Sequence, residues 1–291
     1  MDYPGTVGDL TERLRQGGYL ADRGLATALL VSLSLHRPVL LEGEVGVGKT
    51  EVAKVLAAVF GRRLIRLQCY EGIDTNQALY EWDYARQMLQ IRALSERQVA
   101  DEQAVDKLFG PRFLVERPLL EAVRAGQGAV LLIDEIDRAD DEFEAFLLEV
   151  LSDFQISIPE IGTIKADSPP TVILTSNRTR ELHDALRRRC LYHWIGYPSA
   201  EREVEIVLVR EPGASEQLTR KVVSAVHRLR ELDLVKPPGV AETIDWVRTL
   251  GFLGAADLTP AAADDTLGAV IKDRDDLDLV RENLAELTSG G

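Results

Sequence analysis

The chain has 291 residues, of which 45% are hydrophobic, and its 34 lysines and arginines stand against 48 aspartates and glutamates, a net charge of −14. This apolar content is enough for a buried core and excludes a disordered chain, while the acidic excess argues against wrapping of nucleic acid, which needs clustered lysine and arginine. No run approaches the roughly 18–20 consecutive apolar residues of a membrane helix, and the acidic N-terminus with only two cysteines predicts a cytoplasmic protein without secretory signal or disulfide framework.

The first two thirds of the chain alternate between strand-like and helix-like segments. Short, largely apolar runs predict strands at residues 38–42, 129–133, 171–174 and 192–195, and the charge-mixed run at 63–67 predicts a further strand. Apolar residues at helical spacing predict helices at 25–35, 50–60 and 140–151. Strands that alternate with helices in this way indicate an α/β fold with a central parallel sheet and right-handed crossovers.

Strand signals end after Tyr197-Pro198, and the remaining chain is helical in pattern. We expect helices at residues 199–210, 215–232, 240–251 and 264–287. The sequence therefore predicts two domains, an α/β domain at 1–198 and a small all-α domain at 199–291.

A glycine-rich segment separates the first predicted strand from the helix that follows it. It fits the pattern G-x-x-x-x-G-K-[ST] and reads Gly43-Glu44-Val45-Gly46-Val47-Gly48-Lys49-Thr50. The glycines let the backbone turn so that successive N–H groups cradle phosphate oxygens, and Lys49 brings a cation to the β- and γ-phosphates. The Thr50 hydroxyl is a ligand for Mg²⁺. With a strand before it and a helix after it, this segment is predicted to bind a nucleotide.

Two carboxylates end the strand predicted at 129–133. The carboxyl end of a central strand is where α/β proteins bind ligands. There Asp134 can hold Mg²⁺ through water, and Glu135 can polarise the water that attacks a γ-phosphate. The pair alone would equally suit a surface turn, so its interpretation depends on the glycine-rich segment upstream.

Two later segments carry further polar groups. Asn177 follows the fourth predicted strand, where its amide would orient the attacking water, although an asparagine that begins a turn is common. Residues 187–189 are three adjacent arginines, usually typical of a solvated helix end. A guanidinium offered to the γ-phosphate of a neighbouring subunit would stabilise the transition state in trans, which requires an oligomer.

These four segments, in this order, resemble the AAA+ ATPases. An insertion containing residues 79–92, a predicted hairpin at 155–165 and the sequence Asp134-Glu-Ile-Asp-Arg138-Ala resemble the MoxR branch of that family. Its CoxD-like subgroup is similar in Tyr80-Glu-Trp82, Arg117-Pro-Leu-Leu120, Lys236-Pro-Pro-Gly239 and Thr243-Ile-Asp-Trp246. The resemblance implies a P-loop NTPase core of the AAA+ type with a helix-2 insertion and a hairpin before the first sensor strand, followed by a helical lid.

The same resemblance implies an activity and partners. It implies a Mg²⁺-dependent ATP hydrolase that forms a hexameric ring, binds ATP between subunits, and acts as a chaperone or activator of a client protein. The metal would be held by Thr50 and Asp134. The implied partner bears a von Willebrand factor A domain, and the implied client is a metalloenzyme such as molybdenum–copper carbon monoxide dehydrogenase, since NorQ and CbbQ activate other metalloenzymes. Neither nucleic acid nor a membrane span is expected.

Several residue roles come only from this resemblance. The arginine finger, the guanidinium that reaches the γ-phosphate of a neighbouring subunit, is expected to be Arg189, with Arg188 as the second candidate. Residues Tyr19 to Asp22 should lie near the adenine. Many MoxR proteins have a second sensor arginine, but the matching stretch at residues 237–242 contains none. No residue is therefore assigned to that role.

Alternatives remain open at this level. A nucleic-acid motor of the helicase or clamp-loader kind uses a similar hairpin, and an assembly factor gated by ATP binding would need no productive turnover. Trp82 and Tyr84 either face a partner or pack within the insertion. The isoleucines of the hairpin either line a pore or pair across it, and the pairing is favoured for Ile156, Ile158 and Ile164. The four histidines lack metal-ligand spacing, and Cys190 is expected to be a small buried apolar group.

Overall fold

The computed structural model describes residues 4–96 and 110–288. Contacts between residues divide the chain into two compact units. The first comprises Met1–Gly17, Ala21–Glu42 and Val52–His193, and the second comprises Gly18–Leu20, Gly43–Glu51 and Trp194–Gly291. By its contacts, the glycine-rich segment is thus grouped with the C-terminal region.

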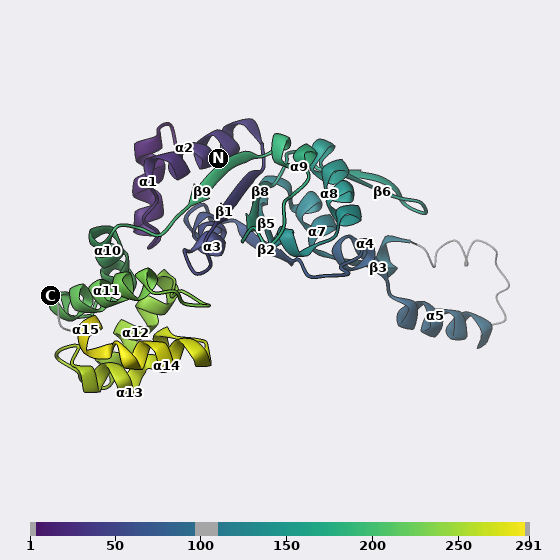
Figure 1. Ribbon diagram of the computed structural model, residues 1–291. Coiled ribbons are helices and arrows are strands. Elements are labelled where there is room, and N and C mark those ends of the chain that lie inside the picture. The colour runs from purple at the N-terminus through teal and green to yellow at the C-terminus, as the bar shows by residue number, and fades with distance from the viewer. Residues whose placement is uncertain (1–3, 97–109, 289–291) are drawn as a thin grey trace. The chain divides into compact units, whose positions relative to one another are not determined.

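A five-stranded sheet with the order β2-β5-β8-β1-β9 is the centre of the fold (Figure 1). The strands are β1 (Val39–Gly43), β2 (Arg63–Gln68), β5 (Ala129–Asp134), β8 (Thr171–Ser176) and β9 (Leu191–Ile195). Strand β5 pairs in parallel with β2 and with β8, and β8 pairs in parallel with β1. Every residue of β1, β5 and β8 is buried, as expected of central strands that helices cover on both faces.

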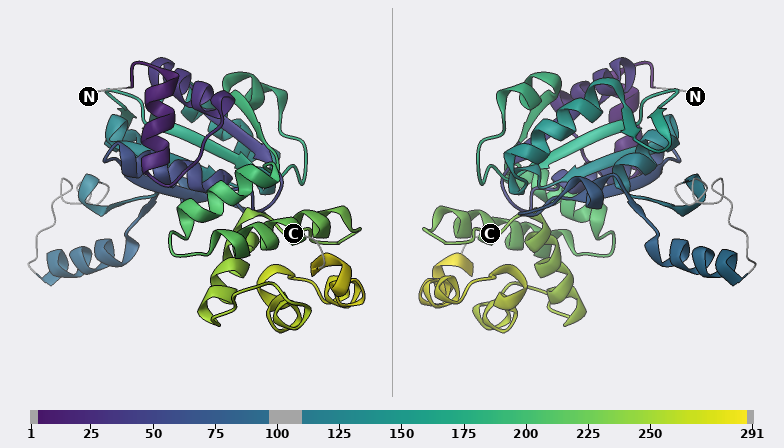
Figure 2. Two further views of the ribbon diagram at one scale, coloured as in Figure 1. Left: turned by 90° about the vertical axis from the view of Figure 1, so that its left-hand side faces the viewer. Right: turned by 90° about the vertical axis from the view of Figure 1, so that its right-hand side faces the viewer.

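Helices lie on both faces of this sheet (Figure 2). They are α1 (Val7–Gln16), α2 (Arg23–Leu35), α3 (Lys49–Val59), α7 (Pro118–Ala125), α8 (Asp141–Asp153) and α9 (Asp184–Arg189). Aspartates begin two of them, because the Asp22 carboxylate accepts from Leu25 N and the Asp140 carboxylate accepts from Phe143 N, each at 2.8 Å. The predicted α/β fold with a parallel sheet is confirmed.

The insertion after β2 is closed by a small sheet of its own. Its elements are α4 (Thr75–Ala78), β3 (Tyr80–Trp82), α5 (Tyr84–Glu96), a 3-10 turn at Pro111–Phe113 and β4 (Leu114–Glu116). Strands β3 and β4 pair antiparallel, with Glu81 opposite Val115. In Figure 1 the insertion lies at the end of the first unit away from α1 and α2.

The predicted hairpin at 155–165 is present as β6 (Gln155–Ile158) and β7 (Gly162–Lys165). Ile156 lies opposite Ile164, and Ile156 and Ile158 are buried in the core of the first unit. Gly162 has φ +98°, a conformation that favours glycine at the turn. Ile156 and Ile164 therefore pair across the hairpin, as predicted, and Ile158 packs in the core.

The second unit is helical beyond β9. It contains α10 (Ala200–Arg210), α11 (Glu216–Glu231), α12 (Val240–Phe252), α13 (Pro260–Val270), α14 (Arg274–Glu282) and α15 (Leu284–Thr288). The prediction of one helix over 264–287 is wrong, because the chain forms three helices there. The helix α13 ends at Val270, and the extended Asp273 caps the start of α14, because its carboxylate accepts from Asp275 N at 3.1 Å. None of the described helices is long and apolar enough to cross a membrane.

One buried carboxylate joins three helices of this unit. Glu203 of α10 has no exposed surface, and it accepts both terminal nitrogens of Arg230 at 2.7 and 2.8 Å. The Thr243 hydroxyl donates to it at 2.6 Å, and His227 Nε2 lies 2.9 Å away. These partners compensate the negative charge of the Glu203 carboxylate, which would be costly to bury without them.

Replacing Glu203 by alanine is expected to destabilise the protein by about 3–5 kcal/mol, because it leaves the Arg230 guanidinium buried without its partner. The matched control is Glu205→Ala on the same helix, which removes an exposed pair with Arg202 and should change stability by about 0.5 kcal/mol or less. Urea unfolding followed by circular dichroism measures both. Equal, small losses would contradict a structural role for the buried carboxylate.

Candidate functional site

The predicted site residues follow strands whose carboxyl ends meet at one edge of the sheet. Gln68 at the end of β2 lies opposite Asp134 at the end of β5, and Glu42 near the end of β1 lies opposite Ser176 at the end of β8. Because all these strands are parallel, their ends share one edge. That edge is where an α/β sheet binds ligands.

Asp134 is almost fully buried and held from two sides. Its Oδ1 accepts from the Thr175 hydroxyl at 2.6 Å, and its Oδ2 accepts from Arg66 Nε at 3.0 Å and Nη2 at 2.6 Å. Arg66 therefore balances the charge of this carboxylate within the first unit. The carboxylate keeps one orientation because two different elements hold its two oxygens.

Glu135 occupies an unusual backbone conformation. Its φ of +55° is left-handed, which is uncommon for a residue other than glycine and is found at functional sites. Its amide donates to the Thr175 hydroxyl at 2.9 Å. Its Oε2 accepts from Gln68 Nε2 at 3.0 Å and from Arg138 Nη1 at 3.1 Å. About a third of the side chain is exposed, so the carboxylate is positioned and still accessible.

Asn177 is placed by a second buried aspartate. Asp137, which is 2% exposed, accepts from the backbone amides of Asn177 at 3.1 Å and Thr179 at 2.8 Å, and from the Thr179 hydroxyl at 2.8 Å. The turn after β8 is thereby tied to the segment after β5. The structure thus brings Asp134, Glu135 and Asn177 to the same edge of the first unit.

The glycine-rich segment lies in the second unit and begins α3 at Lys49. Gly46 and Gly48 have φ +76° and +94°, which fits a loop whose amides turn inward. Lys49 is buried, and its Nζ donates to the carbonyls of Gly43 at 2.7 Å and Glu44 at 2.6 Å. The ammonium is therefore directed back into the loop.

Two other segments of the second unit lie beside this loop. A Cβ built on Gly48 would lie 3.7 Å from Cε2 of Tyr19, the first of the residues expected near an adenine. At the start of α12, Ala241 N donates to Gly46 O at 3.2 Å. Glu242 stands here in the stretch that lacks the second sensor arginine, and its Oε2 accepts from Gly239 N at 2.9 Å. The residue after Ala241, which contacts the loop, is thus the acidic Glu242 and not an arginine.

The three adjacent arginines differ in their surroundings. Arg187 turns inward, with its guanidinium 5.7 Å from the Tyr192 ring centre and 3.8 Å from the buried Glu42 carboxylate. Burial, with the neighbouring Glu42, raises the pKa of the Tyr192 phenol. Arg188 and Arg189 are exposed, and neither side chain forms an ion pair with a residue that the structure describes.

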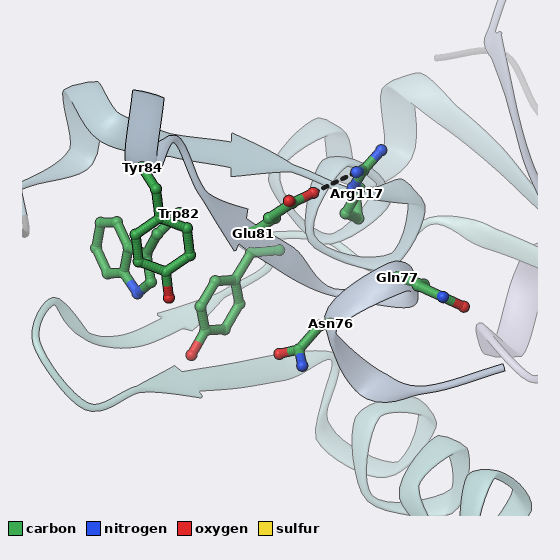
Figure 3. Close-up of a pocket in the computed structure, with 7 residues that line it drawn as sticks. Asn76, Gln77, Glu81, Trp82, Tyr84 and Arg117 are labelled. Atoms are coloured by element: carbon green, nitrogen blue, oxygen red, sulfur yellow. Dashed lines mark hydrogen bonds and ion pairs between the residues drawn. The ribbon is translucent and has the colours of Figure 1, made fainter. Parts of the chain in front are cut away.

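A pocket of about 410 Å³ lies on the insertion (Figure 3). It is lined by Asn76, Gln77, Tyr80, Glu81, Trp82, Tyr84 and Arg117. Glu81 and Arg117 form an ion pair at its rim, drawn as a dashed line in Figure 3. Trp82 is only 8% exposed and packs in the core, whereas Tyr84 is 64% exposed. The packing interpretation thus holds for Trp82 and not for Tyr84.

Sequence reasoning missed the residues that hold the predicted ones. Arg66, Gln68 and Thr175 contact the Asp134–Glu135 pair, and only their places near strand ends could have pointed to them. Asp137 stood within the quoted Asp134-Glu-Ile-Asp-Arg138 motif without a role. No group of three or more histidines, cysteines, aspartates and glutamates gathers as a metal site within residues 4–96 and 110–288.

The chain matches a family model described as AAA domain (dynein-related subfamily) over residues 38–190. It is 26% identical to the protein NorQ of Paracoccus denitrificans (strain Pd 1222) over 202 residues, covering 67% of this chain and 65% of NorQ. It is 30% identical to chaperone protein ClpB 2 of Nostoc sp. (strain PCC 7120) over 176 residues, 59% of this chain and 16% of ClpB 2. The chain thus spans less than two thirds of either relative.

Among solved structures, a RuvB variant from Thermotoga maritima is similar to this fold with a TM-score of 0.52 and 17% sequence identity. The similarity covers 100% of this chain and 82% of that one. At this identity the match bears on the fold alone. It agrees with a P-loop core followed by a helical region.

The two thiols offer a test of the site's packing. Cys69 is buried after β2, its amide donates to Asp134 O at 2.9 Å, and burial with the Asp134 charge raises its pKa to about 12. Burial likewise raises the pKa of Cys190 to about 12. Roughly one thiol in 10⁴ is then ionised at pH 8.

We expect neither cysteine of the native protein to react appreciably with Ellman's reagent at pH 8, and both to react after denaturation in guanidinium. Below the pKa the thiolate fraction rises about tenfold per pH unit, so the native rate should show no plateau near pH 9. A native thiol that reacts at once, or a plateau at an ordinary pKa, would contradict this packing.

Proposed function

The chain belongs to the AAA domain family, in its dynein-related subfamily, and from that membership we propose that it is a Mg²⁺-dependent ATP hydrolase that does conformational work on a client protein. One observation carries the proposal. Strand β1 continues into the Lys49 loop, β5 ends in Asp134 and Glu135, and both strands pair in parallel with β8. The core would span residues 1–198 and the lid residues 199–291.

The loop residues Gly43 to Thr50 would bind the phosphates. Their inward-turned amides donate to phosphate oxygens, and Lys49 exchanges its carbonyl acceptors for the β- and γ-phosphates. Tyr19, beside Gly48, would contact the base. Glu44, Val45 and Val47 would contribute backbone amides, whereas Lys49 and Thr50 would also contribute side chains.

The residues present fit a magnesium ion. The Thr50 hydroxyl and the Asp134 carboxylate are oxygen donors, which Mg²⁺ prefers, and one or two protein oxygens plus substrate phosphates are the usual way it is held. When bound, the metal neutralises phosphate charge. Thr175 and Arg66 hold the two Asp134 oxygens, so the carboxylate would already be oriented when the metal binds.

Glu135 would accept the proton of the attacking water, and the side-chain amide of Asn177 would orient that water. The contacts from Gln68 and Arg138 hold the Glu135 carboxylate before it acts. A general base needs both a fixed position and access to water, and Glu135 has both.

The exposed arginines support completion of the site by a second subunit. Arg189, with Arg188 as the second candidate, would reach the γ-phosphate of a neighbouring subunit and stabilise the charge that develops there. The proposed assembly is a homo-hexameric ring with ATP between subunits. The protein would act in the cytoplasm.

The proposed work is chaperone-like activation within the MoxR branch. Similarity to NorQ and to ClpB 2 supports a protein client over other substrates. We propose a von Willebrand factor A domain protein as partner and a metalloenzyme as client, with the CoxD-like segments favouring molybdenum–copper carbon monoxide dehydrogenase. A net charge of −14 disfavours a nucleic-acid motor.

Two variants of the purified protein test the activity. Glu135→Gln should retain bound ATP while phosphate release falls by about 10²–10⁴-fold, because the base is lost and the binding groups remain. Lys49→Ala should lose bound nucleotide. Phosphate release and the nucleotide retained after gel filtration measure these effects.

Glu149→Gln is the control, since Glu149 is exposed on α8, and it should match the unmodified protein. Equal phosphate release by all four proteins would contradict the ATPase. Salt-sensitive DNA binding that stimulates hydrolysis would favour the motor instead. Full client activation by Glu135→Gln would show that ATP binding suffices.

A further inference from the structure

Arg37 binds the C-terminal end of α9, the helix that carries the three adjacent arginines. It lies between α2 and β1, and its Nη2 donates to the carbonyls of Arg188 at 3.1 Å, Arg189 at 3.2 Å and Cys190 at 3.4 Å. Its Nε donates to Arg189 O at 3.3 Å as well. One guanidinium thus gathers three consecutive carbonyls that are 151 to 153 residues away in sequence.

This contact answers a need of the short helix α9. The last carbonyls of any α-helix lack partners within it, and a helix of only six residues consists almost entirely of ends. Three arginines in the last turn repel one another while interacting favourably with the helix dipole. A planar guanidinium with five donors can bind several carbonyls at once, which an ammonium cannot do in the same way.

Arg37 is itself fixed to the sheet and to α2. The Ser32 hydroxyl donates to Arg37 O at 2.6 Å, and Leu191 N donates to Pro38 O at 2.8 Å. His36 ends α2 with φ +52° and so directs the chain into β1. The guanidinium therefore starts from a backbone that is held on both sides.

The three adjacent arginines of α9 have different contacts. Arg187 is drawn inward by Glu42 and the Tyr192 ring, whereas the main chain of Arg188 and Arg189 is held by Arg37. Their side chains are left exposed. Contacts fix the backbone from which the two exposed guanidinium groups project.

We propose that Arg37 is a positioning residue for Arg188 and Arg189, fixing the direction in which they reach the nucleotide of a neighbouring subunit. The inference rests on the proposed ATPase with a finger in trans. Arg37 itself contacts no nucleotide in this arrangement, so its loss should impair the neighbour's turnover and spare its own subunit's ATP binding.

The test compares Arg37→Ala with Arg189→Ala and with Arg15→Ala, an exposed arginine on α1, as control. Arg37→Ala should lower kcat by about 10²-fold, the cost of misplacing a catalytic group by about 1 Å, with nucleotide affinity unchanged. Arg37→Lys should recover part of the activity, because one ammonium can bind one carbonyl. Thermal unfolding of each variant shows whether the fold is kept.

Subunit mixing separates positioning from a merely structural role. Glu135→Gln subunits have intact fingers but no turnover of their own. Added to Arg37→Ala subunits, they should restore hydrolysis, whereas Arg189→Ala subunits should not. Arg37→Ala activity equal to that of the unmodified protein, or a loss that Glu135→Gln subunits do not restore, would overturn the inference.

A protein that is not an ATPase with an arginine finger in trans would give different results in these assays. In that case the unmodified protein would not hydrolyse ATP, or Arg189→Ala would hydrolyse it normally. If Arg189→Ala is inactive and Arg37→Ala is fully active, the ATPase stands and only the role of Arg37 falls.

Discussion

The Thr175 hydroxyl joins the ends of the two central strands, because it donates to Asp134 Oδ1 and accepts from the Glu135 amide. This single side chain orients the proposed metal ligand and stabilises the left-handed backbone of the proposed base. It can do so only in the observed parallel register of β5 and β8, in which Ile133 lies opposite Leu174. A slip of one residue would turn Thr175 to the other face of the sheet and leave both carboxylates without it.

The electrostatics of the site are opposite to those of the whole chain. An excess of 14 negative charges disfavours polyanionic partners, yet arginines surround the buried acids where the chemistry is proposed. Arg66 and Arg138 contact the Asp134–Glu135 pair, and Arg187 approaches Glu42. An acidic chain can in this way hold cations beside the carboxylates to which the chemistry is assigned, where a phosphate chain would need them.

Much of the core was predictable because local pattern and burial agree there. The uninterrupted apolar run at 129–133 became a fully buried strand, and Asp140 capped the helix expected after it. The C-terminal helices were predicted less well, since α13 ends at Val270 and Asp273 begins α14 inside the span predicted as one helix. A capping carboxylate competes with the backbone of a longer helix, and periodicity alone does not reveal which of the two prevails.

By itself the sequence determined the chemical groups, because the glycine loop, Lys49, Thr50, the Asp134–Glu135 pair and Asn177 are specified by residue type at short spacing. Only the tertiary structure decided which residues hold these groups in place. Gln68 reaches Glu135, Thr175 reaches Asp134, and Arg37 reaches the carbonyls of Arg188 and Arg189 across long stretches of chain. The physical reason is that hydrogen bonds between distant segments depend on strand order and register, which no local pattern encodes.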